Sequence, residues 1–364
     1  MIRLTVPDVG EEELEAVRAV FATGMLVQGE QVAAFEAAVA RRLGVAHAVA
    51  CSSGTAALHL ALTVLGIGPG DEVLVPAFTF PATGNAAALC GAQPVLVDVR
   101  PGTYAMDPRR AAERVSEHTR AVVPVHPFGL SADLEPILAL AAERGLAVVE
   151  DAACALGADY QGRPCGTLGR MGCFSFHPRK AVTTGEGGMV VTGDGELARR
   201  LRALRNHGLE RRQGRVECIA PGFNYRLTDF QAAIGLVQLG KLEGAIAARR
   251  RLAARYRQAL EPIPWLTPPA EPQDRGHVYQ SYVVTVSADR DRDALIAALR
   301  EREVETTIGT YALNALDYYR RAYGAEPADC PVAYSLSRST LALPLYAGMG
   351  EEAVDQVAEA LRNA

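Results

Sequence analysis

Residues 121–151 read AVVPVHPFGLSADLEPILALAAERGLAVVED. Two short apolar runs, 121–125 and 146–150, enclose a longer segment, 133–144, in which the apolar residues have helical spacing. Both runs are continuously apolar rather than alternating, which is typical of strands covered on both faces of a sheet. A strand, a helix and a second strand in this order predict a parallel α/β unit.

The helix inside this unit has recognisable ends. Asp133 is suited to cap its first turn, and Gly145 is suited to end it. Between them, four apolar residues fall on one face: Leu134, Ile137, Leu138 and Ala141. We therefore expect a helix over 133–144.

Apolar runs of the same kind flank this unit on both sides, at 47–51, 72–75, 94–97, 172–176 and 188–192. Helical patterns fit between most of them, so we expect an α/β fold with a mostly parallel seven-stranded sheet. Only residues 177–187 separate the last two runs, and they show no helical pattern. Since a parallel crossover needs about a dozen residues or more, usually a helix, the strand at 188–192 is predicted to be antiparallel.

The remainder of the chain predicts a second, smaller unit. A long helix is expected at 228–260, where Thr228 and Gln231 have the spacing of a capping box. A proline-rich segment follows, then a strand at 278–286, a helix near 291–302 and further helices. We expect a large α/β domain over residues 1–245 and a small C-terminal α+β domain over 246–364.

Composition excludes several classes of protein. The 364 residues are 49% hydrophobic and 22% charged, which is ordinary for a globular protein. The net charge of −5 argues against nucleic acid as a partner. No signal peptide and no apolar stretch long enough to cross a membrane is present, so no membrane partner is expected. The seven scattered cysteines form no metal-binding pattern and fit the reducing cytoplasm.

Lysine is nearly absent from this chain. Only Lys180 and Lys241 are lysines, and the other 35 of the 37 basic residues are arginine. Lys180 lies in a glycine-rich loop directly after a buried strand, and lysine forms Schiff bases where arginine does not. A solvated loop lysine is the alternative. Lys241 falls on the long helix and is interpreted as a surface residue, and the arginine-rich segment 210–222 as a surface loop.

Two further candidates lie at the carboxyl ends of predicted strands, where ligands bind in such sheets. Residues 52–55, Ser-Ser-Gly-Thr, open a helix after the first strand, which suits a phosphate and equally suits an ordinary N-cap. Asp151 ends the fifth strand, where a carboxylate pairs well with a positively charged ring nitrogen. Capping of a helix that begins at Ala152 is the alternative.

Several motifs together resemble the DegT/DnrJ/EryC1/StrS family of pyridoxal-phosphate-dependent sugar aminotransferases, which have the aspartate aminotransferase fold (type I). The resemblance covers nearly the whole chain. Its motifs are Ser-Ser-Gly-Thr-Ala-Ala-Leu at 52–58, Pro-Ala-Phe-Thr-Phe-Pro-Ala-Thr at 76–83, Glu-Asp-Ala-Ala at 150–153, Phe-Ser-Phe-His-Pro at 174–178 with Lys180, Thr-Gly-Glu-Gly-Gly at 184–188, Asn-His-Gly at 206–208, and Gly-Phe-Asn-Tyr-Arg-Leu at 222–227 before Gln231-Ala-Ala.

The resemblance implies two catalytic residues. Lys180 would hold the cofactor, pyridoxal 5'-phosphate, as an internal aldimine and, once released, move a proton between the substrate Cα and the cofactor C4′. Asp151 would pair with the pyridinium nitrogen and keep it protonated, which makes the ring an electron sink. No metal is implied.

The resemblance also implies a set of cofactor contacts. Gly54, Thr55 and the hydroxyl of Ser175 would bind the phosphate, and Phe80 would stack on the ring. Asn224 would reach the phosphate site of a neighbouring subunit, which implies a homodimer with shared active sites. A core position for Phe80, a plain strand position for Ser175 and a turn position for Asn224 are the alternatives.

Two stretches depart from the family pattern or stay unassigned. Cys154 stands where many relatives have Gln or His near the ring hydroxyl, and a thiol makes only weak hydrogen bonds, so it is a cofactor contact or a small packed residue. Residues 306–316 occupy a segment that approaches the active site in relatives, but they identify no sugar.

The resemblance implies transfer of an amino group from L-glutamate to a keto group of a nucleotide-linked deoxysugar. A keto-cyclitol of the scyllo-inosose type is the alternative acceptor. A sugar dehydratase of the same family would carry His in place of Lys180. A non-catalytic regulator would not need Lys180 and would usually bring an added DNA-binding domain.

Overall fold

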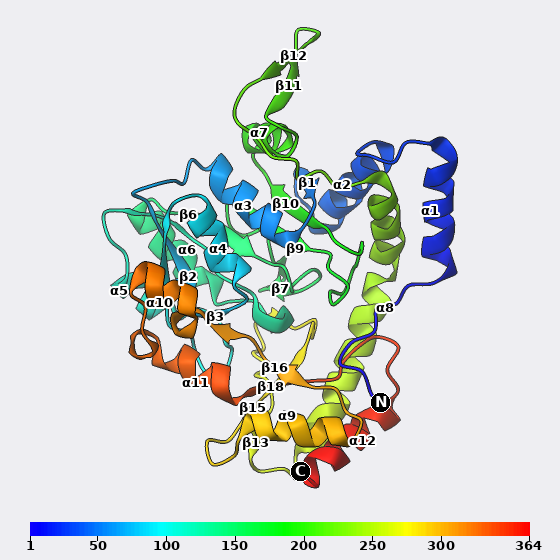
Figure 1. Ribbon diagram of the computed structural model, residues 1–364, viewed down its shortest axis with the longest axis vertical. Helices are drawn as coiled ribbons and strands as arrows, with labels where there is room; N and C mark the ends of the chain where they lie inside the picture. The colour runs from blue at the N-terminus through cyan, green and yellow to red at the C-terminus, as the bar shows by residue number, and fades with distance from the viewer.

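The computed structural model describes residues 1–364 and is built around a seven-stranded sheet (Figure 1). The strand order is β1-β10-β9-β6-β5-β2-β4, and β10 runs antiparallel to both of its neighbours while every other pairing is parallel. The predicted fold class is confirmed, including the direction of β10. The strands are β1 His47–Cys51, β2 Glu72–Pro76, β4 Gln93–Val97, β5 Thr119–Val122, β6 Ala147–Asp151, β9 Met171–Ser175 and β10 Gly188–Thr192.

Helices cover both faces of this sheet, which explains the continuously apolar strands. In β1, Val49 packs into the apolar cluster with α3 and α7, whereas Ala48 and Ala50 pack into the cluster with α2 and α8. Successive residues of a strand point to opposite faces, so both sets must be apolar when both faces are covered. The main helices are α1 Glu11–Thr23, α2 Glu30–Leu43, α3 Gly54–Val64, α6 Leu134–Arg144, α7 Gly195–Arg205 and α8 Asp229–Leu260.

The smaller unit is an antiparallel sheet with helices beside it. Its strand order is β13-β15-β18-β16, and its core joins α9, α12 and the end of α8. The predicted strand over 278–286 is shorter than expected, because Tyr279 has a positive φ of 48° and β15 begins only at Tyr282. The elements are β13 Leu266–Thr267, β15 Tyr282–Val286, α9 Arg292–Glu301, β16 Thr307–Ile308, β18 Thr340–Leu343 and α12 Glu351–Arg362.

Helix α8 belongs to both units. It packs against α1 and α2 in the large unit and against α12 in the small one (Figure 1). The predicted division after residue 245 falls inside this continuous helix, and the N-terminal Ile2 pairs with Val304 beside the small unit. The division into 1–245 and 246–364 stays a prediction.

Lys241 is not the surface residue expected from its place on α8. Its Nζ lies 2.8 Å from Oε1 of the buried Glu13 and 3.0 Å from Oε2 of Glu12, both on α1. Helical spacing alone does not reveal that another helix covers this side of α8. Lys241 is therefore part of the packing between α1 and α8.

The arginine-rich segment expected as a loop forms a β-hairpin that projects from the molecule (Figure 1). Its turn residues Gln213 and Gly214 both have positive φ, 48° and 81°, as the tight hairpin turn requires.

The remaining short elements are α4 Ala82–Leu89, α5 Pro108–Glu113, α10 Asp317–Tyr323, α11 Pro331–Ser339, β3 Phe78–Thr79, β7 Asp159–Tyr160, β8 Arg163–Pro164, β11 Leu209–Arg212, β12 Arg215–Cys218, β14 Arg275–Gly276 and β17 Tyr311–Ala312.

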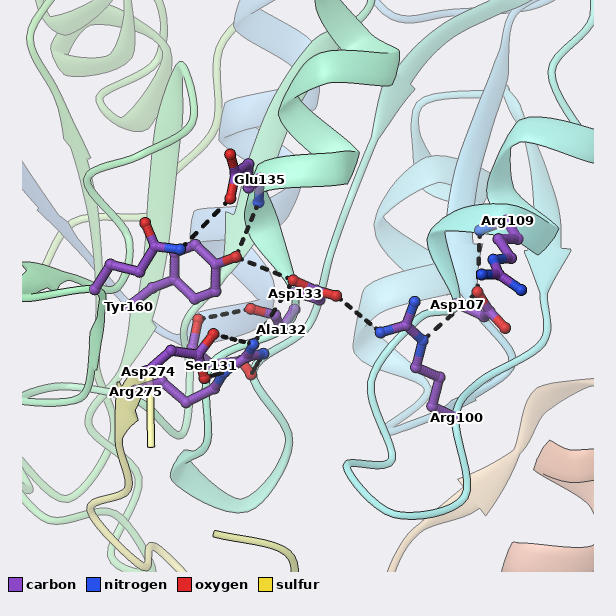
Figure 2. Close-up of polar contacts among 11 residues, drawn as sticks. Arg100, Asp107, Arg109, Ser131, Ala132, Asp133, Glu135, Tyr160, Asp274 and Arg275 are labelled. Atoms are coloured by element: carbon purple, nitrogen blue, oxygen red, sulfur yellow. Dashed lines mark hydrogen bonds and ion pairs between the residues drawn. The ribbon is translucent and has the colours of Figure 1, made fainter. Parts of the chain in front are cut away.

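Asp133 precedes α6 but does not cap it with its side chain. Figure 2 shows that its carboxylate instead lies between Arg100, whose Nη1 is 2.8 Å from Oδ2, and Tyr160, whose hydroxyl donates to Oδ1 at 3.0 Å. Arg275 stacks over the Tyr160 ring at 4.8 Å and also ion-pairs with Asp274. These contacts fasten the segment that leads to the small unit onto the large sheet.

Candidate active site

Lys180 lies in the loop between β9 and β10, at the carboxyl end of β9. The loop folds back on itself, since the Lys180 N–H donates to the His177 carbonyl at 2.8 Å and the Thr184 N–H to the Phe176 carbonyl at 2.9 Å. The Lys180 side chain is half-buried, and its Nζ donates to Sγ of Cys154 at 3.0 Å. The structure therefore places Cys154 beside the amine of Lys180.

Asp151 is the last residue of β6, the strand next to β9 in the sheet. It is 5% exposed, and its Oδ2 accepts from the hydroxyl of Thr83 at 2.8 Å while Oδ1 accepts from the Ala153 N–H at 3.2 Å. No helix begins at Ala152, so the interpretation of Asp151 as a helix cap is wrong. A buried carboxylate that has hydrogen bonds but no cationic partner matches a cationic ligand group.

The neighbouring Glu150 points away from Asp151, because consecutive strand residues face opposite sides. It is fully buried, and its carboxylate accepts from three backbone N–H groups at 2.6–2.7 Å, those of Gly166, Leu168 and Gly169. His126 Nε2 donates the fourth hydrogen bond at 2.9 Å. The Ala132 N–H donates to His126 Nδ1, so the proton of the neutral ring sits on Nε2. Glu150 is a structural residue that the sequence did not distinguish from a site residue.

Three backbone segments approach one another closely at the start of α3, and we call Ser53, Gly54, Ser175 and Gly188 the cradle. Ser53 caps this helix through the Ala56 N–H at 3.1 Å. A Cβ added to Gly54 would lie 2.8 Å from the Cβ of Ser175, and one added to Gly188 would lie 2.2 Å from the carbonyl oxygen of Ser53. The first turn of a helix leaves N–H groups without an acceptor in the helix, and Thr55 in this turn is exposed, so the start of α3 suits a phosphate. The N-cap and phosphate interpretations are therefore compatible.

Phe80 is 63% exposed, so its interpretation as a core residue is wrong. It follows β3, which pairs with β17 from the C-terminal part of the chain. This pairing brings Tyr311 edge-on to Phe80, with ring centroids 6.2 Å apart. The segment 306–316 thus reaches the carboxyl edge of the large sheet, as expected.

Asn224 is exposed and makes no side-chain hydrogen bond within the chain. Its backbone bridges to Asn206, and the next residue, Tyr225, accepts a hydrogen bond from the Ser52 N–H at 2.9 Å. Asn224 therefore lies near the start of the cradle, free to contact a group outside the chain. Its contact with a second subunit stays a prediction.

Burial sets the protonation of two groups beside the site. It raises the pKa of the Cys173 thiol well above the ordinary value, so this thiol is neutral. It also lowers the pKa of His177, which precedes Lys180 in the loop, so the imidazole is neutral at pH 7. No group of three or more His, Cys, Asp or Glu side chains suited to a metal ion is present.

A separate cavity, of about 540 Å³, lies at the opposite edge of the sheet. Its lining comes from the amino ends of β2, β5, β6 and β9 and from α6, and it includes Arg120 and Arg170. None of the candidate site residues lines it. In parallel sheets ligands bind at the carboxyl ends of strands, so we place the site at Lys180.

The family model of the DegT/DnrJ/EryC1/StrS aminotransferase family matches residues 7–362. The chain belongs to this family. It is an aminotransferase, and family members depend on pyridoxal 5'-phosphate. None of its helices is long and apolar enough to span a bilayer.

Three relatives illustrate the likeness. GDP-perosamine synthase of Caulobacter vibrioides is 40% identical over 336 residues, 92% of this chain and 90% of the relative. The crystal structure of the aminotransferase TlmJ from Streptoalloteichus hindustanus is 39% identical, with a TM-score of 0.94 over 100% of this chain and 98% of that one. The sugar aminotransferase Spr1654 from Streptococcus pneumoniae, solved in its PMP form, is 27% identical, with a TM-score of 0.95 over 100% and 97% of the two chains. The chain is a sugar aminotransferase of the DegT/DnrJ/EryC1/StrS family.

The residues present fit the cofactor of the family. Pyridoxal phosphate carries an aldehyde, a ring nitrogen that gains a proton and a phosphate. The half-buried amine of Lys180, the buried carboxylate of Asp151 and the cradle at Gly54 match these three groups in charge and chemistry.

Proposed function

We propose that this sugar aminotransferase moves an amino group from L-glutamate to a keto group of a nucleotide-linked deoxysugar. The observation that carries the proposal is the half-buried Lys180, which follows β9 directly beside the strand that ends in the buried Asp151. The likeness to a GDP-perosamine synthase supports a nucleotide-linked acceptor.

Lys180 has two roles in this proposal. Its Nζ would hold the cofactor covalently in the resting enzyme. Once freed by the incoming amine, the same Nζ would accept a proton from the substrate carbon and return it one position away. When bound, pyridoxal phosphate supplies the electron sink that makes the Cα–H bond acidic. The half-buried position of Lys180 limits competing protons from water.

The other residues bind and orient. Asp151 holds a proton at the ring nitrogen, and Thr83 fixes the direction of its carboxylate. The first turn of α3, at Gly54 and Thr55, and the hydroxyl of Ser175 hold the phosphate. We further propose that Phe80 covers the ring of the cofactor. Cys154, whose Sγ lies 3.0 Å from the Lys180 amine, would contact the cofactor near its ring hydroxyl.

We also propose a homodimer in which Asn224 of one subunit reaches the phosphate site of the other. An apolar surface near the end of α1 supports a subunit interface. Phe21, Met25 and Val27 are each more than half exposed there, and a second subunit would cover them. Seven free cysteines support a cytoplasmic location.

The near absence of lysine makes the covalent link easy to test. Protein supplied with pyridoxal phosphate should show an absorption band in the near-visible range, and borohydride should fix the cofactor on one lysine. Peptide mapping has only two possible answers, Lys180 and Lys241. Lys180→Arg, which keeps the charge but not the primary amine, should abolish the adduct. An adduct on Lys241, or no binding by the native protein, would contradict the proposal.

The acceptor is tested with a panel of nucleotide-linked keto sugars and one keto-cyclitol. Each is incubated with glutamate, and the release of 2-oxoglutarate is measured. Turnover of a nucleotide-linked sugar supports the proposal, and turnover of the keto-cyclitol alone would replace it.

A further inference from the structure

The second lysine of the chain occupies a polar network at the side of the Lys180 loop. Lys241 contacts Glu13, whose side chain is 5% exposed and whose carboxylate also accepts from the Gly10 N–H at 2.8 Å. Burial raises the pKa of Glu13, but hydrogen bonds from Lys241, Gln238 and the Gly10 N–H outweigh it and lower the pKa to about 2. Glu13 is thus a buried anion whose nearest cation is Lys241.

Gln238 joins this ion pair to the loop. Its Nε2 donates to Oε1 of Glu13 at 2.9 Å and to the carbonyl of Asp8, while its Oε1 accepts from the Thr183 N–H at 3.4 Å. The side chain is 4% exposed. The carboxylate fixes the orientation of the amide, because a reversed amide would turn its NH₂ group toward the Thr183 N–H.

Thr183 is a key residue of the loop, three positions after Lys180. Its hydroxyl donates to the Phe176 carbonyl at 3.1 Å and accepts from the Gly185 N–H at 3.1 Å. Thr183 therefore ties the exit of the loop to its entrance. A shift of its backbone would move the whole loop that carries Lys180.

The opposite side of the loop has a similar support. Gln280 donates through Nε2 to the carbonyl of Arg179, and the Gln280 carbonyl accepts from Arg249 Nη1 at 3.1 Å. A buried glutamine thus bonds to the loop backbone on each side of Lys180. A cation of α8 supports each one, Lys241 for Gln238 and Arg249 for Gln280. On the Gln280 side Arg249 bonds only carbonyl oxygens, whereas on the Gln238 side Lys241 acts through a carboxylate.

We propose that Lys241, Glu13 and Gln238 are positioning residues that hold the loop at Thr183 and so direct the amine of Lys180 toward the cofactor. This inference rests on the proposed role of Lys180. The side chain of Lys180 has four rotatable bonds, so the position that its amine reaches depends on where the loop backbone lies. Lys241 keeps the Glu13 carboxylate charged and in place, and the carboxylate keeps Gln238 oriented.

The test compares three variants of the whole protein. Lys241→Met leaves Glu13 without its cation, Lys241→Arg restores a cation, and Arg255→Met removes the Arg255–Asp355 ion pair, which lies on the same helix but does not touch the loop. Hydrogen exchange of peptides over 177–187 is measured without cofactor, and the rate of borohydride-trappable attachment to Lys180 is measured with it.

We expect Lys241→Met to speed exchange across 177–187 and to slow covalent attachment, each about fivefold, the effect of losing one ordinary hydrogen bond. Lys241→Arg should recover most of both, and Arg255→Met should change neither. Equal exchange in Lys241→Met and Arg255→Met would overturn the inference.

Two further variants cover the case in which Lys241→Met does not fold. Glu13→Gln with Lys241→Met removes both charges, so no unpaired charge is buried. The new amide oxygen still accepts from Gln238, and the bond that is lost is the one from the Gly10 N–H, which lies outside the loop. Gln238→Met removes the contact to Thr183 directly. We expect near-native exchange in the first and fast exchange in the second, and the reverse order would overturn the inference. Native protein that fails to bind the cofactor would instead refute the proposed function, because the exchange result does not depend on binding.

Discussion

Glu150 and Asp151 are adjacent carboxylates that the fold uses for different purposes, and exchanging each for its amide separates them. In Glu150→Gln, one carboxylate oxygen becomes an NH₂ group. Each oxygen of Glu150 accepts two hydrogen bonds, Oε1 from Leu168 and Gly169, and Oε2 from Gly166 and His126. Whichever oxygen becomes the NH₂ group, the two N–H groups that donated to that oxygen then face another donor and lose their hydrogen bonds.

The surroundings cannot adapt to this change. Three of the four donors are backbone N–H groups, and the fourth, His126, cannot switch its proton because the Ala132 N–H occupies its other nitrogen. A hydrogen bond to a charged group contributes roughly 1.5–3 kcal/mol, so two lost bonds cost about 3–6 kcal/mol. That is a large part of the 5–15 kcal/mol typical of folded proteins.

Asp151→Asn is the matched control. An asparagine oxygen still accepts from the Ala153 N–H, and its NH₂ group donates to the Thr83 hydroxyl, which turns to donate to Thr79 at 3.0 Å. We therefore expect less than about 1 kcal/mol of lost stability. The neutral amide no longer favours a protonated ring nitrogen, so activity should fall steeply.

Both variants are measured by urea unfolding, followed by circular dichroism, and by transamination with glutamate. The expected pattern is an unstable Glu150→Gln protein and a stable but inactive Asp151→Asn protein. If Glu150→Gln unfolds within about 1 kcal/mol of the native protein, the buried carboxylate does not hold the 166–169 turn as described.

Three other changes test separate parts of the molecule. Gly188→Ala places a Cβ 2.2 Å from a carbonyl oxygen of the cradle and should weaken cofactor binding roughly tenfold or more in a fluorescence titration, whereas Gly193→Ala, with nothing within 4 Å, should not. Burial lowers the pKa of His277 from 6.5 to about 3, so the unfolded chain alone gains a proton below pH 6.5. The free energy of unfolding should fall between pH 6.5 and 3 by up to about 1.4 kcal/mol per pH unit from this group, and urea unfolding of His277→Asn should show a smaller fall. Arg275→Met removes the cation over Tyr160 and should lower the free energy of unfolding by about 1–3 kcal/mol, an effect that a native-like urea midpoint would contradict.

The sheet could be predicted because its strands are buried on both faces. Each predicted run overlaps a strand of the structure, and the short link 177–187 indicated the direction of β10. The strand expected over 278–286 was too long, since a positive φ at Tyr279 has no signal in its residue type. The hairpin at 209–218 was missed because it is exposed on both faces, so alternation of polar and apolar residues is absent.

The candidate site was predictable where a residue type is chemically distinctive. Lys180 and Asp151 fall at carboxyl ends of neighbouring strands, as expected, although their roles stay proposals. Spacing could not show that Glu150 faces a different environment from Asp151, since it does not tell which side of a strand faces the site. Nor could it place Lys241 against Glu13, a contact between residues far apart in the chain.

Helix α8 fixes how the chain tolerates changes of length. Leu242 and Ile246 of this helix pack into the apolar cluster under the large sheet, and Leu252 and Tyr256, further along, pack into the core of the small unit. One residue inserted between Ile246 and Leu252 would rotate the rest of the helix by roughly 100° and turn its apolar side away from the core of the small unit. One uninterrupted helix therefore fixes the rotational register between the two cores. Single-residue insertions and deletions between Ile246 and Leu252 should prevent folding, whereas the same changes at the tip of the exposed hairpin should be tolerated.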